Sequence, residues 1–235
     1  MLTASIIILF AVAFMVGSLL DLIDNNTWLA NADHSVAKWG SRHGTSDTAK
    51  VLTWITQLGS TVVVIPVLIA VSIFGYKRQR HRDVFVFVAV VGLGQLLLSN
   101  VLKIVVHRDR PAVLHLVSAH GYSFPSGHTV AAASVWSAVA LLVGTGASRR
   151  RRAVLAGAAS LIALSVATSR ALLGVHWISD VIAGLAIGWG WFMITAIVFG
   201  GRSQRLGDPA TPPPGGHTPS VSEDESRIQA SSIGP

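Results

Sequence analysis

Long apolar runs separated by short polar segments dominate the chain as far as residue 200. An α-helix needs about 20 mostly apolar residues to cross the hydrocarbon core of a bilayer. Six runs approach or reach that length, so the pattern predicts an all-α, polytopic membrane protein with six transmembrane helices. The predicted spans are roughly Ala4–Leu20, Thr61–Tyr76, Val84–Val106, His128–Gly146, Ala153–Arg170 and Ile178–Phe199.

Two of these spans allow a second interpretation. The second span contains Pro66 and could begin nearer Thr56, although membrane helices tolerate proline better than soluble helices do. The first could be a signal peptide, but no Lys or Arg precedes its apolar stretch and no clear small-x-small cleavage site follows it. A retained span is therefore the interpretation adopted for the first run.

The composition supports a membrane location. Hydrophobic residues make up 51% of the 235 residues and charged residues only 12%, whereas a typical soluble domain carries about 25% charged residues. The net charge of +7 could suggest nucleic acid, but the basic residues lie in short clusters between apolar runs, and no nucleic-acid partner is expected. The chain has no cysteine, which excludes disulfides and cysteine-based metal or redox chemistry.

The distribution of Lys and Arg predicts the orientation, because cytoplasmic loops of membrane proteins are enriched in these residues. With six spans, the clusters between and directly after the spans on one side hold ten of them, and the loops and helix ends on the other side hold seven, so we expect the first side and both termini to be cytoplasmic. The ten are Lys77, Arg78, Arg80, Arg82, Arg149, Arg150, Arg151, Arg152, Arg202 and Arg205; the seven are Lys38, Arg42, Lys50, Lys103, Arg108, Arg110 and Arg170. The clusters are interpreted as topological anchors, with lipid-headgroup recognition as the alternative.

Two segments lie outside the predicted spans. Asp21–Gln57 is expected on the outer side, where Trp28, Trp39 and Trp54 would anchor a short helix at the interface or, alternatively, grip a lipid tail. The chain after Arg202 turns to Pro, Ser, Gly and acidic residues, which cannot build a core. We therefore expect one membrane domain, 1–202, and a disordered cytoplasmic tail, 203–235, that is dispensable for chemistry.

Three polar groups occur at the predicted outer ends of spans three to six. Lys103 and Arg110 are separated by two helical turns, and Pro111 favours relaxation of the last turn so that Arg110 swings toward the same place. The run 125–128 (PSGH) directly precedes a span, where the first free N–H groups of a helix form an anion site. Each group alone has a plain structural explanation, as snorkelling cations or an ordinary helix cap.

The third group is Ser169, Arg170, His176 and Asp180. His176 and Asp180 are four residues apart at the start of span six, where a helix makes them neighbours. A carboxylate beside an imidazole fixes its tautomer and leaves the other nitrogen free to attack. Because adjacent spans alternate in direction, all three groups fall in one outer layer. Cations, an anion site, two histidines and a carboxylate are what phosphoryl transfer requires.

These motifs resemble those of the type 2 phosphatidic acid phosphatase superfamily. The run 103–111 (KIVVHRDRP) matches its KxxxxxxRP motif, 125–128 matches PSGH, and 169–180 (SRALLGVHWISD) matches SRxxxxxHxxxD. The three motifs occur in the family's order with every signature residue present. The motif region covers 103–180, and the six-span pattern extends the resemblance to about Phe199.

The resemblance implies a role for each matching residue. His176 would attack phosphorus and form a phosphohistidine, Asp180 would orient it, and His128 would serve as acid and then base. No metal and no cofactor are implied. The residues that would hold the phosphate oxygens are Lys103, Arg110, Ser126, Gly127 and Arg170, with Ser169 as a lesser contributor.

The expected function is therefore metal-independent hydrolysis of a lipid phosphomonoester or diphosphate. Candidate substrates are a polyprenyl diphosphate, phosphatidic acid, phosphatidylglycerol phosphate or a prenyl-linked sugar phosphate. The pocket is expected at the extracytoplasmic face. One alternative is a lipid transporter or binding protein that retains a phosphate pocket, although binding alone needs no nucleophile. A haloperoxidase-like soluble enzyme is disfavoured by the six spans. His107, His115 and His120 are interpreted as solvated or interfacial loop residues.

Overall fold

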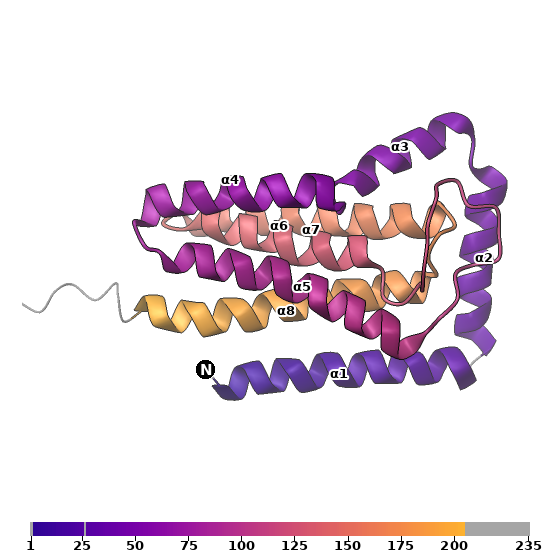
Figure 1. Cartoon of the computed structure of the whole chain (residues 1–235), viewed down its shortest axis with the longest axis horizontal. Helices are drawn as coiled ribbons and strands as arrows, with labels where there is room; N and C mark the ends of the chain where they lie inside the picture. The colour runs from indigo at the N-terminus through magenta and orange to yellow at the C-terminus, as the bar shows by residue number, and fades with distance from the viewer. Residues whose placement is uncertain (1, 26, 205–235) are drawn as a thin grey trace, which may run out of the picture. The chain divides into compact units, whose positions relative to one another are not determined.

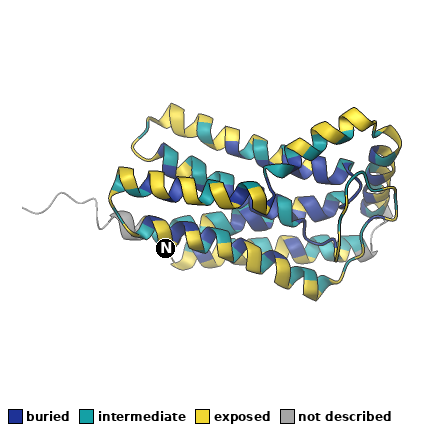
Figure 2. Cartoon of the chain, turned by 45° about the horizontal axis from the view of Figure 1, so that its top comes forward, coloured by how far each residue is buried: buried dark blue, intermediate teal, exposed yellow. Residues whose placement is uncertain are grey.

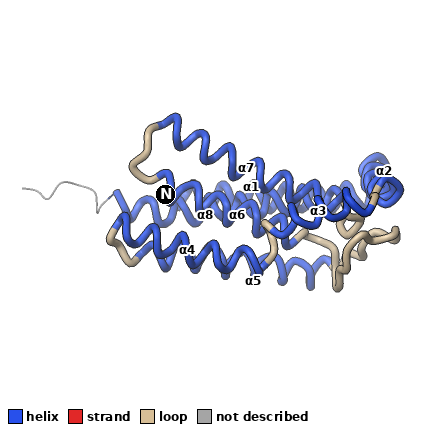
Figure 3. The backbone as a smooth tube through the Cα atoms, turned by 90° about the horizontal axis from the view of Figure 1, so that it is seen from above, coloured by secondary structure: helices blue, strands red, loops and turns tan. Residues whose placement is uncertain are grey.

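The computed structural model describes residues 2–25 and 27–204, which form helices and loops only (Figure 3). The membrane helices belong to one compact unit, Met1–Gly201. Of the tail predicted at 203–235, all but the last two residues of α8 lie outside the described residues. The helices in chain order are α1 (Leu2–Asn25), α2 (Thr27–His43), α3 (Ser46–Gln57), α4 (Thr61–Gln79), α5 (Asp83–Val106), α6 (Gly127–Gly144), α7 (Arg149–Leu172) and α8 (Ile178–Gln204).

Six stretches of the described chain are long and apolar enough to cross a membrane, which confirms the predicted number of spans. The first span is longer than predicted, Leu2–Ile23, and large apolar side chains cover its outward face. Figure 2 shows exposed residues on the outward faces of the helices and buried ones between them. In a bilayer the outward faces meet lipid, so apolar exposure is the expected pattern here.

The second stretch is Ser46–Gln79, which contains α3 and α4 with a bend between them. At the bend, a side chain at Gly59 would collide with the carbonyl oxygen of His128. The indole nitrogen of Trp136 donates to the carbonyl of Leu58 at 2.9 Å, which fixes the bend against α6. Pro66 lies inside α4 without interrupting it. The bend thus lies against the first turn of α6, where the PSGH motif ends.

Helix α6 lies at the centre of the bundle, and every residue from Thr129 to Val135 is buried. Small residues let its neighbours approach closely. A Cβ atom at Gly188 of α8 would lie 2.6 Å from the carbonyl oxygen of Val130 and 2.7 Å from Cβ of Ala133. The sequence 184–188 (GxxxG) therefore brings α8 against α6, as small-residue motifs do in membranes.

The segment predicted to lie outside the spans, Asp21–Gln57, contains α2 and α3 instead of a single short helix, and α3 belongs to the second membrane-spanning stretch. Helix α2 runs across one end of the bundle, beside the long loop that joins α5 to α6 (Figure 1). Trp28, Trp39 and Trp54 are all more than half exposed. On its other face α2 packs against the end of α7, where a side chain at Gly40 would collide with the carbonyl oxygen of Leu172. Residues of α2 are thereby brought next to the motif region.

The opposite end of the bundle contains the start of α1, the α4–α5 and α6–α7 connections and the last turns of α8 (Figure 1). The three motifs lie at the α2 end, because α5 and α7 finish there and α6 and α8 begin there. The predicted alternation of spans is therefore present, and it gathers the motif residues in one layer.

Candidate active site

The loop after α5 turns Arg110 back toward the bundle. Helix α5 ends at Val106, and His107 adopts a left-handed conformation (φ 51°) with its N–H donating to the carbonyl of Lys103 at 3.1 Å. A left-handed residue directly after a helix is a common helix terminator. Arg110 is thus not on the helix, and the predicted relaxation of the last turn takes the form of a complete helix end.

Lys103 and Arg110 meet at one carbonyl group. Lys103 Nζ donates to the carbonyl of Tyr122 at 2.7 Å, and Arg110 Nη2 donates to the same oxygen at 3.3 Å. The guanidinium of Arg110 also donates to the carbonyls of Gly121 and His120, each at 2.9 Å. Burial lowers the pKa of Arg110, whereas the charge of nearby Asp180 raises it. The two cations therefore lie side by side, as predicted.

The PSGH motif forms the start of α6. Ser126 is the N-cap residue and is fully buried, but its hydroxyl accepts from Thr129 Oγ1 at 3.0 Å and does not cap the helix. Its N–H donates to the carbonyl of Asp180 at 3.2 Å, which joins this motif to the third. A Cβ atom at Gly127 would lie 3.2 Å from Ser99 Oγ, so glycine keeps the backbone accessible there. His128 follows in the first turn.

The third motif spans the end of α7 and the start of α8. Ser169 and Arg170 are buried in the last turn of α7. The Ser169 hydroxyl donates to the carbonyl of Val166 at 2.7 Å. His176 lies in the connection before α8, which begins at Ile178. The sequence predicts His176 on the helix itself; in the structure the tight turn at Gly174 (φ 75°) instead places it before the helix.

His176 and Asp180 still form a pair. Asp180 Oδ2 lies 3.4 Å from His176 Nδ1, longer than a normal hydrogen bond, and accepts from the backbone N–H of Trp177 at 3.0 Å. His176 Nε2 faces the other way and lies 3.2 Å from Arg110 Nη1. Catalytic hydrogen bonds are often long before substrate binds. The ring therefore presents Nδ1 to the carboxylate and Nε2 to the cations.

The surroundings of His176 keep its imidazole neutral. Burial lowers the pKa of His176 to about 4, and the nearby guanidinium groups of Arg170 and Arg110 act in the same direction, whereas Asp180 opposes them. At neutral pH the ring then has a free lone pair on one nitrogen. A neutral imidazole with one nitrogen beside a carboxylate is the form that acts as a nucleophile.

The remaining predicted residues belong to the same cluster. His128 interacts electrostatically with Arg170, His176, Lys103 and Arg110. Two groups that we assigned to the loop stay there: the His107 ring packs edge-on against Tyr122, and His115 Nε2 lies 2.8 Å from the carbonyl of Pro111. The structure thus links seven of the nine predicted site residues through hydrogen bonds or electrostatic interactions, and the other two, Gly127 and Ser169, adjoin members of the cluster in the chain. Those nine are Lys103, Arg110, Ser126, Gly127, His128, Ser169, Arg170, His176 and Asp180.

Two further residues were not predicted. Arg108 Nη1 donates to Asp180 Oδ1 at 2.6 Å, and its Nη2 donates to Asp33 Oδ2 at 2.8 Å. We had counted Arg108 only as a loop charge, and Asp33 of α2 had no assignment. The sequence does contain a pattern that indicates a buried role for Asp33. Asp33 lies four residues after Leu29 and four before Ala37, so all three share one face of α2, and in the structure that face is buried. An acid on an apolar stripe indicates a buried partner.

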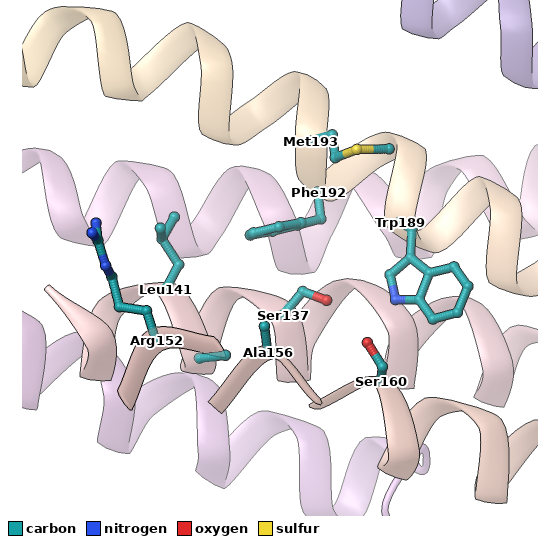
Figure 4. Close-up of a pocket in the computed structure, with 9 residues that line it drawn as sticks. Ser137, Leu141, Arg152, Ala156, Ser160, Trp189, Phe192 and Met193 are labelled. Carbon is teal, nitrogen blue, oxygen red and sulfur yellow. The ribbon is translucent and has the colours of Figure 1, made fainter. Parts of the chain in front are cut away.

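A cavity of about 520 Å³ between α6, α7 and α8 lies apart from this cluster (Figure 4). Its lining is mostly apolar, with Arg152 at one end and Trp189 toward the other, and it includes none of the predicted site residues. Within residues 2–25 and 27–204, no group of three or more histidine or acidic side chains is arranged to hold a metal ion.

The chain is similar to known phosphatases. The PAP2 superfamily model matches residues 83–204. Phosphatidylglycerophosphatase B of Bacillus subtilis is 32% identical over 141 residues, which cover 59% of this chain and 69% of that protein. Lipid A 1-phosphatase of Rhizobium etli is 37% identical over 126 residues, and this match spans about half of each protein (49% and 49%).

A solved structure has the same fold. The crystal structure of a transmembrane PAP2 type phosphatidylglycerolphosphate phosphatase from Bacillus subtilis superposes with a TM-score of 0.75 at 26% identity, covering 84% of this chain and 96% of that one. The family match includes all three motifs, and the relatives are phosphatases. The chain therefore belongs to the PAP2 superfamily and is a multi-span membrane phosphatase.

Proposed function

We propose that the chain removes phosphate from a membrane lipid through a covalent phosphohistidine on His176. The observation that carries this proposal is the orientation of the ring, with Nδ1 facing Asp180 at 3.4 Å and Nε2 facing Arg110 at 3.2 Å. The Nε2 lone pair attacks phosphorus, and the bond from phosphorus to the leaving oxygen breaks. Asp180 offsets the positive charge that develops on the ring.

His128 supplies the proton in the first step. It donates a proton to the leaving oxygen of the lipid, which departs as an alcohol or a phosphate monoester. In the second step the now neutral His128 takes a proton from water, which attacks phosphorus and breaks the N–P bond. Phosphate and free His176 result, so atoms and charges balance over the cycle.

The cations and the start of α6 would hold the phosphoryl oxygens. Lys103 and Arg110 already meet at one carbonyl, and Arg170 ends α7 beside them. The Ser126 and Gly127 backbone opens a helix whose first N–H groups favour an anion. Charge spreads over these oxygens in the transition state, so preorganised donors there lower the barrier.

The substrate class follows from the membrane setting and the relatives. The named relatives act on phosphatidylglycerol phosphate and on the 1-phosphate of lipid A. We propose a lipid phosphomonoester or a lipid diphosphate, with phosphatidylglycerol phosphate the first to test and polyprenyl diphosphate the second. The Lys/Arg bias of ten to seven supports a site at the extracytoplasmic face, with both termini inside.

The experiment is phosphate release by purified protein in detergent from a panel of phosphatidylglycerol phosphate, phosphatidic acid, lipid A and polyprenyl diphosphate. Wild-type protein should release phosphate from at least one member, and His176→Ala should lower kcat by about a thousandfold or more. The matched control is His81→Gln, at the opposite end of the bundle, where the ring lies 3.2 Å from the carboxylate of Asp83.

A chemical readout separates covalent catalysis from other mechanisms. Rapid quenching with ³²P-labelled substrate should trap a phosphoenzyme that is stable in base and labile in acid, as an N–P bond is. His176→Ala should give none. A wild-type protein that binds the lipids without releasing phosphate would support the transporter alternative and overturn the proposal.

A further inference from the structure

Asp33 is a buried acid that the proposed mechanism does not use. It lies on α2 and only 1% of its surface is exposed. Asp33 Oδ1 accepts from the backbone N–H of Ser179 at 2.9 Å, and Asp33 Oδ2 accepts from the Ser179 hydroxyl at 2.6 Å. Ser179 directly precedes Asp180. Asp33 therefore holds the first turn of α8 from a helix that precedes it by about 150 residues in the sequence.

Arg108 joins Asp33 to Asp180. Its Nη1 donates to Asp180 Oδ1 at 2.6 Å and to the Ser179 hydroxyl at 2.7 Å, and its Nη2 donates to Asp33 Oδ2 at 2.8 Å. The guanidinium also lies over the indole of Trp177, 5.3 Å from the ring centroid. A guanidinium has a rigid planar fork, so contacts on two sides fix its orientation.

The two carboxylate oxygens of Asp180 have different partners, one on Arg108 and one on His176. Oδ1 of Asp180 is taken by Arg108, and Oδ2 is the oxygen that faces His176 Nδ1. The carboxylate cannot rotate without breaking the contact with Arg108. The orientation of the carboxylate thus depends on a cation that is itself held by Asp33.

The negative charges of Asp33 and Asp180 also require a cation between them, and Arg108 supplies it. Asp33 and Asp180 are both almost fully buried, and an unpaired carboxylate in such surroundings is costly. A single guanidinium, with 15% of its side chain exposed, bridges the two. Loss of Arg108 would leave two buried like charges facing one another, whereas loss of the Asp33 charge would leave Arg108 paired with Asp180 alone.

We propose that Arg108, anchored by Asp33 of α2, is a positioning residue that fixes the Asp180 carboxylate so that it orients and charge-balances His176. This inference rests on the proposed function, since it assigns how the nucleophile of that reaction is held. It also gives α2 a part in catalysis through Asp33. The hydrogen bonds of Arg108 go to Ser179, Asp180 and Asp33 and not to the residues proposed to bind phosphate, so its role differs from theirs.

The kinetic signature distinguishes positioning from substrate binding. Lys103, Arg110 and Arg170 are untouched when Arg108 changes, so KM should stay near its wild-type value. Arg108→Gln should lower kcat by about 10- to 100-fold, by analogy with residues that orient metal ligands through hydrogen bonds, whose loss has an effect of that size. Arg108→Lys keeps the charge but not the fork, and it should recover part of the loss.

The Asp33→Asn variant tests the anchor. It should lower kcat by less than Arg108→Gln does, because Arg108 keeps Asp180 as a partner. Combined with Arg108→Gln it should cost nothing further, because both changes act through the same guanidinium. The matched controls are Asp47→Asn and Arg42→Gln, on exposed residues of α3 and α2, and both should keep wild-type kcat.

The experiment measures kcat, KM and thermal unfolding in detergent for wild type, the four variants and the two controls. A fall in kcat with unchanged KM, partial recovery by lysine and a non-additive double variant would support the inference. Should Arg108→Gln fail to fold, Arg108→Lys and Asp33→Asn carry the test. Raised KM with unchanged kcat, or Arg108→Lys and Asp33→Asn at wild-type kcat, would overturn it. A wild-type protein with no activity on the lipid panel would instead refute the proposed function.

Discussion

Asp180→Asn is the most direct test of the charge arrangement in the site. The substitution keeps the shape of a side chain that is completely buried and removes its charge. Arg108 keeps Asp33 as its partner after the change, with Nη2 donating to Asp33 Oδ2 at 2.8 Å. The buried pair that remains is neutral overall, so we expect the variant to fold. A loss of activity can then be assigned to the reaction.

The expected fall in kcat for Asp180→Asn follows from the distance between the Asp180 carboxylate and the His176 ring. Asp180 Oδ2 lies 3.4 Å from His176 Nδ1, and the ring gains a positive charge as Nε2 bonds to phosphorus. Opposite unit charges about 4 Å apart interact by about 4 kcal/mol at an effective dielectric constant of about 20. Loss of that interaction in the transition state lowers kcat by about a thousandfold.

The assay is steady-state phosphate release in detergent, with kcat and KM determined separately. The ground-state complex has a neutral ring, so KM should change little while kcat falls. Asp47→Asn serves as the control, since Asp47 is exposed and pairs with Lys50 in the same helix turn at 3.3 Å. Retention of more than about a tenth of the wild-type kcat by Asp180→Asn would refute the reasoning, because the remaining effect would be below about 1.4 kcal/mol.

Four further predictions concern other parts of the protein. Burial lowers the pKa of His176 to about 4, so as the pH falls below about 6.5 the unfolded chain takes up a proton on His176 before the folded protein does. The free energy of unfolding should therefore keep the full contribution of His176 above about pH 6.5 and fall by about 3 kcal/mol toward pH 4. Denaturant unfolding of His176→Gln in detergent should lack this pH-dependent fall. EDTA should leave phosphate release nearly intact and vanadate should inhibit it; loss on chelation that Mg²⁺ restores would contradict the mechanism. Cysteine at Ser118 should react with an impermeant thiol reagent in intact cells and cysteine at Ser148 only after the membrane is opened, whereas the reverse pattern would overturn the predicted orientation. Gly188→Ala should lower stability by about 1–3 kcal/mol, because its Cβ would lie 2.6 Å from a carbonyl oxygen of α6, whereas Gly157→Ala, with nothing within 4 Å, should not; equal melting temperatures would contradict the packing argument.

The sequence alone determined the number of spans and the layer that holds the motifs. Both depend on local or one-dimensional properties: the length of an apolar run is set by bilayer thickness, and the alternation of spans assigns each helix end to a side. The pairing of His176 with Asp180 was also predictable, since it spans four residues. The placement of His176 before α8, and not on it, was not, because helix ends shift by a few residues with the turn that precedes them.

Only the tertiary structure revealed the roles of Arg108 and Asp33. Arg108 looks in the sequence like one more basic residue at a membrane boundary, and Asp33 looks like a polar residue of an interfacial helix. Their importance arises from hydrogen bonds that span 72 residues to Asp180 and 75 residues to one another. No local pattern specifies which distant carboxylate a guanidinium will meet, because that choice depends on how α2 packs across the end of α7 and brings a buried acid to the first turn of α8.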